Sequence, residues 1–411
     1  MPTTIDELKG ERVGICVSGG LDSRTVTRRL VDAGVNVVCF TADLAQPDET
    51  DINGVKQKMA PCGAQTHVVD LRDAMAQACF ELILAQATYD GGYWNTTGMA
   101  RAVTVKGLIP EMQKQGCTVL AHGATGRGND QMRFERYTNV LAPEMKVYAP
   151  WRDPALLAQF PGRTQMAEYL KKAGIQAFVG GKKRYSTDAN LAGLSYEAED
   201  LESLATPATI VQPQMGVWPL EAPDKPELFS VSFEQGRAVR INGRKVMPLE
   251  AMQEANQSGG RNGVGLKNAL ENRIIGTKSR GVYEAPGMEL LAYCLLQIYQ
   301  ATLDRRATEL FQSLAKLVAR QIYDGRLFDP ATSAALAALD VFAASATGTV
   351  AVTLYKGNIT FSSLADCPAS LYNEADSSME ASAGLNPVSS QGYAEIQSVE
   401  ARALARAGQI A

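Results

Sequence analysis

A glycine-containing hexapeptide, Ser18-Gly19-Gly20-Leu21-Asp22-Ser23, carries the strongest chemical signal in the chain. It follows an apolar run at residues 13–17, and a helical pattern begins within it at Asp22. A buried strand that turns through two glycines into a helix leaves backbone N–H groups free at the positive end of the helix dipole. This arrangement predicts a phosphate-binding site. The alternative is a glycine-rich strand-to-helix turn that binds nothing.

The loop differs from the common nucleotide-binding motifs. It lacks the Gly-Lys-Ser/Thr of a Walker loop and the third glycine of a dinucleotide fingerprint. It resembles the loop of the ATP pyrophosphatases (PP-loop proteins), which hold the two phosphates that leave together when ATP becomes AMP and pyrophosphate. The resemblance implies adenylylation of a substrate oxygen and argues against transfer of the γ-phosphate.

Composition limits the classes of protein to consider. The chain has 411 residues, enough for two domains and a tail, and its 45% hydrophobic and 20% charged residues are typical of a soluble globular protein. A net charge of −4 gives no reason to expect nucleic-acid binding. We see no apolar run of membrane-spanning length and no signal peptide. Seven scattered cysteines without a Cys-x-x-Cys pair favour reduced thiols in the cytoplasm, and only two histidines argue against a histidine-based metal centre or triad.

Strand and helix patterns alternate through the first part of the chain. We expect strands at residues 12–17, 35–40, 66–69, 118–123 and 146–149, and helices at 22–33, 51–62 and 73–87. Alternation with buried strands predicts an α/β fold with a doubly wound parallel sheet. Ligands bind beyond the carboxyl ends of such strands. Ser18, Ala42 and Gly123 should therefore converge on one nucleotide.

The pattern changes after about residue 172. Strands are expected at 208–212, 229–233 and 238–241, a long helix at 287–323, and a hairpin at 350–355 and 359–361. Residues 366–393 read as a loosely packed arm, and 393–406 as a short helix. We therefore predict a nucleotide domain at residues 1–172, an α+β domain at 173–365, and an arm with a terminal helix at 366–411.

Five further segments are rich in small polar groups and charges where a purely structural role predicts none. They span residues 93–101, 122–134, 185–191, 195–197 and 271–284. Together with the loop, they look like the signature segments of the argininosuccinate synthase family, in its order and approximate spacing, from about residue 11 to about residue 360. The wordings NTT-x-x-x-RAVT, YSTD-x-N and RGVYEAPG place the chain nearest the enteric-bacterial branch.

The resemblance implies an ATP-dependent ligase of arginine biosynthesis. Such an enzyme joins citrulline to aspartate through a citrullyl-AMP intermediate and releases pyrophosphate and AMP, with Mg²⁺ as cofactor. No dedicated metal-ligand cluster is expected, although Asp22 is placed to help hold the ion. On this resemblance the ATP-binding residues are Cys16, Val17, Ser18, Gly19, Gly20, Leu21, Asp22, Ser23, Arg24, Ala42, Gly123, Thr125, Asp130 and Asp188.

The same resemblance assigns the two amino-acid substrates. The aspartate-binding residues are Thr97, Arg101, Thr125, Asn129 and Asp130. The citrulline-binding residues are Tyr93, Asn129, Arg133, Ser186, Ser195, Glu197, Glu271 and Tyr283. Because no conventional general base is evident, we expect catalysis by positioning and charge stabilisation, with Asp22, Arg101 and Asp130 carrying most of it.

Each segment taken alone also has a structural explanation. Asp188 fits a helix N-cap, Asn129-Asp130 a turn, Arg133 a solvated helix face, and His122 a structural strand end. Tyr93-Trp94 fits the core, and Tyr283-Glu284 the end of a strand.

Two positions depart from the family. Ser23-Arg24 stands where the family has Thr-Ser, so Arg24 either points to solvent, which we favour, or adds charge near phosphate. Gly98 lacks the hydroxyl that some relatives offer to citrulline, which leaves the amide substrate less defined than the nucleotide chemistry.

Other functions remain open at this point. Another PP-loop ligase acting on a citrulline analogue fits the loop. An asparagine synthetase would need cysteine where Pro2 stands, and tRNA thiolases bring cysteine pairs or a basic surface. A non-catalytic nucleotide-binding regulator would need only the first sheet.

The terminal helix bears on assembly. Tyr393, Ile396, Val399 and Ala403 share roughly one face of it, and a helix this short needs packing to persist. The family forms tetramers with exchanged C-terminal helices. We therefore predict a homotetramer in which residues 386–411 cross to another subunit; the alternative is a frayed surface tail.

Overall fold

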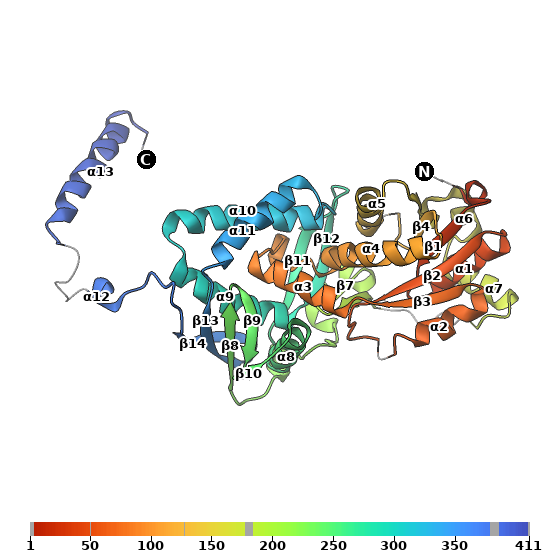
Figure 1. Ribbon diagram of the computed structural model, residues 1–411, viewed down its shortest axis with the longest axis horizontal. Helices are drawn as coiled ribbons and strands as arrows, with labels where there is room; N and C mark the ends of the chain where they lie inside the picture. The colour runs from red at the N-terminus through yellow and green to blue at the C-terminus, as the bar shows by residue number, and fades with distance from the viewer. Residues whose placement is uncertain (1–3, 50, 127, 177–183, 379–385, 410–411) are drawn as a thin grey trace.

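A twisted parallel sheet organises the N-terminal part of the molecule (Figure 1). The computed structural model describes residues 4–49, 51–126, 128–176, 184–378 and 386–409. The strand order is β3-β2-β1-β4-β5, and every neighbouring pair is parallel. The strands are β1 (Arg12–Cys16), β2 (Asn36–Asp43), β3 (Gln65–Asp70), β4 (Val119–His122) and β5 (Lys146–Tyr148).

Helices cover both faces of this sheet, which confirms the predicted doubly wound fold. On one face the buried side chains of β1 pack with those of α1 (Leu21–Asp32), α2 (Gly54–Met59), α6 (Pro154–Gln159) and α7 (Arg163–Lys172). On the other face α4 (Thr96–Lys114) and α5 (Asp130–Leu141) cover Val38, Phe40 and Leu120. Strands buried on both faces read as continuous apolar runs, and for this reason the sequence revealed them.

Two antiparallel sheets build the second part of the molecule. One has the order β10-β9-β8-β13-β14 and the other β11-β12-β7-β6. Their strands are β6 (Ser186–Asn190), β7 (Gly193–Glu197), β8 (Glu227–Glu234), β9 (Arg237–Ile241), β10 (Arg244–Lys245), β11 (Leu266–Asn272), β12 (Lys278–Glu284), β13 (Gly348–Tyr355) and β14 (Asn358–Ala365).

The helices of this part are α8 (Pro248–Arg261), α9 (Pro286–Thr302), α10 (Arg305–Tyr323) and α11 (Pro330–Ala343). The single helix predicted at 287–323 is wrong, because Asp304 interrupts it. The Asp304 side chain accepts hydrogen bonds from the backbone N–H groups of Arg306 and Ala307, which is an N-cap that starts a new helix. The strand predicted at 208–212 is also wrong: Ala208–Ile210 forms a 3₁₀ turn between Pro207 and Pro213.

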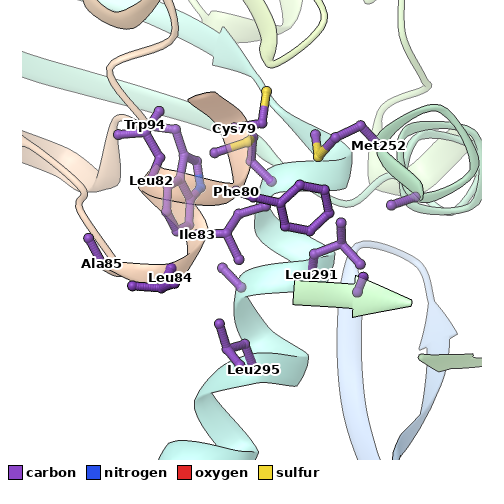
Figure 2. Packing of buried hydrophobic residues seen from close by; sticks show 14 of the residues in the cluster. Cys79, Phe80, Leu82, Ile83, Leu84, Ala85, Trp94, Met252, Leu291 and Leu295 are labelled. Atoms are coloured by element: carbon purple, nitrogen blue, oxygen red, sulfur yellow. The ribbon is translucent and has the colours of Figure 1, made fainter. Parts of the chain in front are cut away.

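The helix α3 (Arg72–Leu84) connects the two parts of the molecule. It follows a strand of the parallel sheet, yet its main contacts are with α8 and α9 of the second part. Figure 2 shows Phe80 and Ile83 of α3 packed beside Met252 and Leu291. Burial of each such side chain contributes about 1.5–3 kcal/mol, so this shared core holds the N-terminal sheet against the second part.

The C-terminal segment separates from this core. After α12 (Glu374–Ser377), the helix α13 (Ser389–Arg406) stands apart from the other elements in Figure 1. Its described residues are almost all exposed, including Tyr393, Ile396 and Val399. The predicted terminal helix is therefore present and begins four residues earlier than expected. Residues 379–385 of the predicted arm, and Arg127 of the 122–134 segment, lie outside the described residues.

Candidate active site

The loop after β1 has the backbone geometry of an anion site. Gly19 has φ +75°, a conformation that favours glycine, and a Cβ there would lie 3.2 Å from the Lys58 side chain. Gly20 is the extended N-cap of α1, and no side chain caps the helix. The first-turn N–H groups at Leu21, Asp22 and Ser23 have no carbonyl one turn earlier to bond. The helix end thus presents unpaired donors, which fit phosphate oxygens.

Side chains of the loop hold this shape. The Ser18 backbone N–H donates to Ser23 Oγ at 3.1 Å, and the two serine hydroxyls lie 3.2 Å apart. Cys16 is half-buried, and desolvation of its thiol raises the pKa to about 12, so we expect the thiol to stay protonated and unreactive. Val17 and Leu21 are buried and can reach a ligand only through their backbones.

The side chains of Asp22 and Arg24, both in the first turn of α1, have different partners. Partial burial raises the pKa of the Asp22 carboxyl, and Arg163 at 3.9 Å opposes that rise. Arg24 Nη1 donates to the Gln176 carbonyl at 2.7 Å, beyond the end of α7. The Arg24 guanidinium is therefore tied to the chain after α7.

Adjacent strands bring the other nucleotide candidates to this loop. In the sheet, Cys16 is paired with Phe40 on one side and His122 on the other, so Ala42 and Gly123 flank the loop. Ala42 lies inside β2, which runs three residues longer than predicted at this end. The Val17 N–H donates to the Phe40 carbonyl at 2.9 Å, and Thr41 Oγ1 donates to the Val17 carbonyl. Ser18, Ala42 and Gly123 therefore follow or end neighbouring strands at the carboxyl edge of the sheet, and their convergence on one nucleotide stays a prediction.

A cavity of about 400 Å³ opens next to this edge. It lies between elements of both parts of the molecule and contains most of the predicted substrate residues. Its lining is Tyr93, Thr97, Arg101, Gly123, Ala124, Thr125, Gly128, Asn129, Asp130, Arg133, Ser186, Thr187, Asp188, Ser195, Glu197, Glu271, Arg273 and Tyr323.

The periodicity of the helices and strands places these side chains on the faces that line the cavity. Thr97 and Arg101 are one turn apart on α4, and Asp130 and Arg133 are one turn apart on α5. In the β6–β7 hairpin, Asp188 is paired with Ser195 and Ser186 with Glu197. Because side chains alternate along strands, these four share one face of the sheet. Asp188 is thus a strand residue, and its explanation as a helix N-cap is wrong.

Arginines and carboxylates alternate across the cavity. Arg101 donates to Asp130 at 2.9 Å and to Asp188 at 2.7 Å, and Thr97 Oγ1 also donates to Asp188 at 3.0 Å. Arg133 Nη1 donates to the other oxygen of Asp130 at 2.9 Å. Burial opposes ionisation of Asp130, but the two guanidinium groups outweigh it and lower the pKa of this carboxyl. This alternation suits zwitterionic ligands, which bring both charges.

Arg133 is buried and belongs to the site, so its explanation as a solvated helix face is wrong. Its Nε and Nη2 donate to the Tyr323 carbonyl at 3.0 and 2.8 Å. Gly98 on α4 makes room for this contact. A Cβ at Gly98 would lie 3.1 Å from the Ile322 carbonyl and 3.5 Å from Arg133 Cζ. The missing side chain at Gly98 therefore has a packing reason, the close approach of the α10 terminus.

The far end of the cavity holds two carboxyl groups with raised pKa values. Burial, and then the charge of Glu271, raise the pKa of Glu197 to about 7, although Arg273 lies 3.6 Å away. Burial also raises the pKa of Glu271, against the nearby Tyr323 and Tyr283 hydroxyls. Glu271 Oε2 is buried and has no hydrogen-bond partner in the described structure. An ammonium group would satisfy both carboxylates.

Some residues beside the site do not line the cavity. Tyr283 does not line the cavity; its ring stacks on Tyr93, with 4.0 Å between centroids, so it supports a lining residue from behind. Trp94 belongs to the core and donates to Glu289 at 2.9 Å. His122 is buried and stacks on Phe134, and burial lowers its pKa to about 3, which fits the structural role considered for it.

Sequence reasoning missed several lining residues, among them Arg273 and Tyr323. Arg273 follows Glu271 by two positions, and this spacing was a usable signal. Tyr323 is the last residue of a helix whose sequence pattern predicts only packing in the core. No local feature therefore identified it as a site residue. Over the residues that the structure describes, no cluster of three metal-ligating side chains occurs, and no helix is long and apolar enough to cross a membrane.

Comparison with known proteins covers nearly the whole chain. The family model of the arginosuccinate synthase N-terminal HUP domain matches residues 12–176, and that of the arginosuccinate synthase C-terminal domain matches residues 185–404. The argininosuccinate synthase of Rhodopirellula baltica is 38% identical over 395 residues, which are 95% of this chain and 97% of that protein. That of Thermotoga petrophila is 37% identical over 399 residues, 95% and 96% of the two chains.

Proposed function

The chain belongs to the argininosuccinate synthase family, and we propose that it condenses L-citrulline with L-aspartate at the expense of ATP. The observation that carries this proposal is a cavity of alternating arginines and carboxylates at the edge of an uncapped, glycine-started helix. A non-catalytic nucleotide regulator would leave the second half of that cavity unexplained. Nothing favours a different PP-loop ligase.

The reaction proceeds in two balanced steps. The ureido oxygen of citrulline attacks the α-phosphorus of ATP, the new O–P bond forms, and pyrophosphate leaves. The aspartate amine then attacks the ureido carbon, loses a proton, and expels AMP with the former ureido oxygen. Both steps develop negative charge on phosphate oxygens, where fixed donors are most effective.

The candidate site residues fall into three groups, one for each substrate. The loop at residues 18–23 holds the leaving phosphates through helix-end N–H groups and hydroxyls, and Ala42 and Gly123 border the nucleotide. Arg101 and Asp130 take the carboxylate and ammonium of aspartate, with Thr97, Thr125 and Asn129 beside them. Glu197 and Glu271 balance the α-ammonium of citrulline, and Arg133 serves its oxygens. These two carboxylates are otherwise costly to ionise, which supports a cationic occupant.

Mg²⁺ fits the same loop. Asp22 is the one carboxylate there, and Mg²⁺ commonly binds through one or two carboxylates together with phosphate oxygens and water. The ion would neutralise charge on the leaving pyrophosphate. The raised pKa of Asp22 is consistent with a carboxylate that awaits a cation.

We further propose that the chain acts in the cytoplasm as a homotetramer. The exposed apolar side chains of α13 support an intersubunit position for residues 386–411. In this view the chain has a nucleotide domain at 1–172, a substrate domain at 173–365 and an assembly segment at 366–411.

Isotope transfer tests the chemistry. Citrulline labelled with ¹⁸O in the ureido group should deliver its label to AMP, because the C–O bond of the intermediate breaks. Pyrophosphate release should also depend on citrulline, measured by omitting each substrate in turn. Label that stays out of AMP, or pyrophosphate released equally without citrulline, would contradict the proposal.

A further inference from the structure

Tyr323 reaches the cavity from an element that no motif marks. It is the last residue of α10, a helix that otherwise packs in the second part of the molecule, and it is 1% exposed. Its ring stacks on Tyr89, with 3.9 Å between centroids, and the Arg133 guanidinium lies 5.0 Å from its centroid. Packing on both sides fixes where its hydroxyl points.

The Tyr323 hydroxyl connects two candidate citrulline residues. It donates to Glu271 Oε1 at 2.9 Å and accepts from Asn129 Nδ2 at 2.9 Å. The directions follow from chemistry, because an amide NH₂ can only donate and an ionised carboxylate can only accept. The backbone carbonyl of the same residue accepts from Arg133. One residue thus touches three elements of the site: α5, β11 and the segment just before α5.

We propose that Tyr323 is a positioning residue for citrulline: its hydroxyl holds one oxygen of Glu271, so that the unpartnered oxygen Oε2 faces the substrate ammonium. This inference rests on the proposed function. In this inference the Tyr323 hydroxyl orients the substrate, and the Tyr323 backbone carbonyl holds the Arg133 guanidinium. The two roles are separable, because replacing Tyr323 by phenylalanine removes only the first.

The charged surroundings of Glu271 determine what loss of the hydroxyl does. Glu197 on β7 repels the carboxylate, while Arg133 on α5, Arg273 after β11 and Tyr283 on β12 favour it. Burial raises the pKa of Glu271, and the Tyr323 hydrogen bond lowers it. Removing that bond should raise the pKa further. Glu271 then takes up a proton at a higher pH and loses its attraction for an ammonium.

The test is Tyr323→Phe. A hydrogen bond to a charged group contributes roughly a factor of ten to a hundred, so the KM for citrulline should rise about tenfold or more. The KM for ATP and kcat should stay within about twofold, because the ring and the carbonyl remain. The acidic limb of kcat/KM for citrulline should move to higher pH, whereas a merely structural role would not move it.

Tyr89→Phe is the matched control. Its ring stacks on Tyr323, but its hydroxyl donates to the Asn272 carbonyl outside the cavity, so kinetics should match the wild type. In a Glu271→Gln background, Tyr323→Phe should add little, because the two changes affect one interaction. An unchanged citrulline KM, or full additivity in that background, would overturn the inference. Wild-type enzyme without citrulline-dependent AMP formation would instead overturn the proposed function.

Discussion

A buried carboxylate, Glu271, and a half-buried one, Glu197, make the far end of the cavity sensitive to pH. Glu197 and Glu271 repel each other, and burial penalises both charges, so each pKa lies above its usual value. Pairs of this kind are frequent where an enzyme needs an ammonium ligand or a proton. Arg273 and the tyrosine hydroxyls compensate in part. A substrate ammonium would neutralise the negative charge that these groups leave uncompensated.

Glu197 gives a pH prediction at this scale. Its pKa of about 7 means that the carboxyl is protonated below that pH and ionised above it. In the proposed role of Glu197 the citrulline ammonium needs the ionised form, so kcat/KM for citrulline should fall as pH drops through about 7. Glu197→Gln should lower the plateau and remove the part of this limb that Glu197 contributes, while the part due to Glu271 remains. The same profile for ATP is the control, and a wild-type citrulline profile that is flat through 7 would contradict the assignment.

At the scale of elements, short segments define the site and packing orients them. The first turn of α5, one face of α4 and the β6–β7 hairpin each contribute two or more side chains to the cavity, and the first turn of α1 contributes its backbone N–H groups to the neighbouring loop. Gly98 lets the terminus of α10 approach α4 closely enough to reach Arg133. In α1, the direction of Arg24 decides whether its charge reaches phosphate.

Arg24→Ser tests that direction. Because Arg24 bonds to the Gln176 carbonyl, the substitution should leave the KM for ATP and kcat unchanged. The lost hydrogen bond should lower the free energy of unfolding by about 1 kcal/mol, measured by denaturant titration. Arg28→Ser removes the same charge one turn farther along α1, where Arg28 pairs with Asp32, and serves as control. A large drop in kcat for Arg24→Ser alone would place the guanidinium on the leaving phosphates.

The whole molecule joins a parallel sheet to an antiparallel part through a shared core, with a helix held away from both. The α3 helix contributes Phe80 and Ile83 to the core of the second part, so the two halves of the cavity keep their relative placement (Figure 2). By contrast, Tyr393 is 67% and Ile396 70% exposed on α13. Apolar side chains left this exposed on a short helix indicate that it packs on something further.

Deleting residues 386–411 tests the assembly. The truncated protein should have a smaller mass by light scattering than the full-length chain, because in the proposed tetramer this helix crosses between subunits. Ile396→Asp should weaken assembly in the full chain, while Ser398→Asp, on the opposite face of α13, should not. A truncated protein that stays a full tetramer would remove this helix from the interface.

Features that depend on short stretches of the chain could be predicted from the sequence alone. The glycine loop, the alternating apolar strands and the family segments predicted the parallel sheet and most, but not all, of the residues that line the cavity, because each depends on neighbours a few residues away. The break at Asp304 and the turn at 208–210 were missed although their signals, an N-cap aspartate and flanking prolines, are local.

By itself, the sequence determined which groups could bind phosphate, carboxylate and ammonium, since residue type and short spacing carry that chemistry. Only the tertiary structure decided how they are joined. Tyr323 lies 194 residues from Asn129 and 52 from Glu271, and it meets both because α10 packs where its last turn enters the cavity. Asp188 became a partner of Arg101, rather than a helix cap, because strand pairing placed β6 opposite α4. Contacts across such distances depend on the packing of whole elements, which no local pattern encodes.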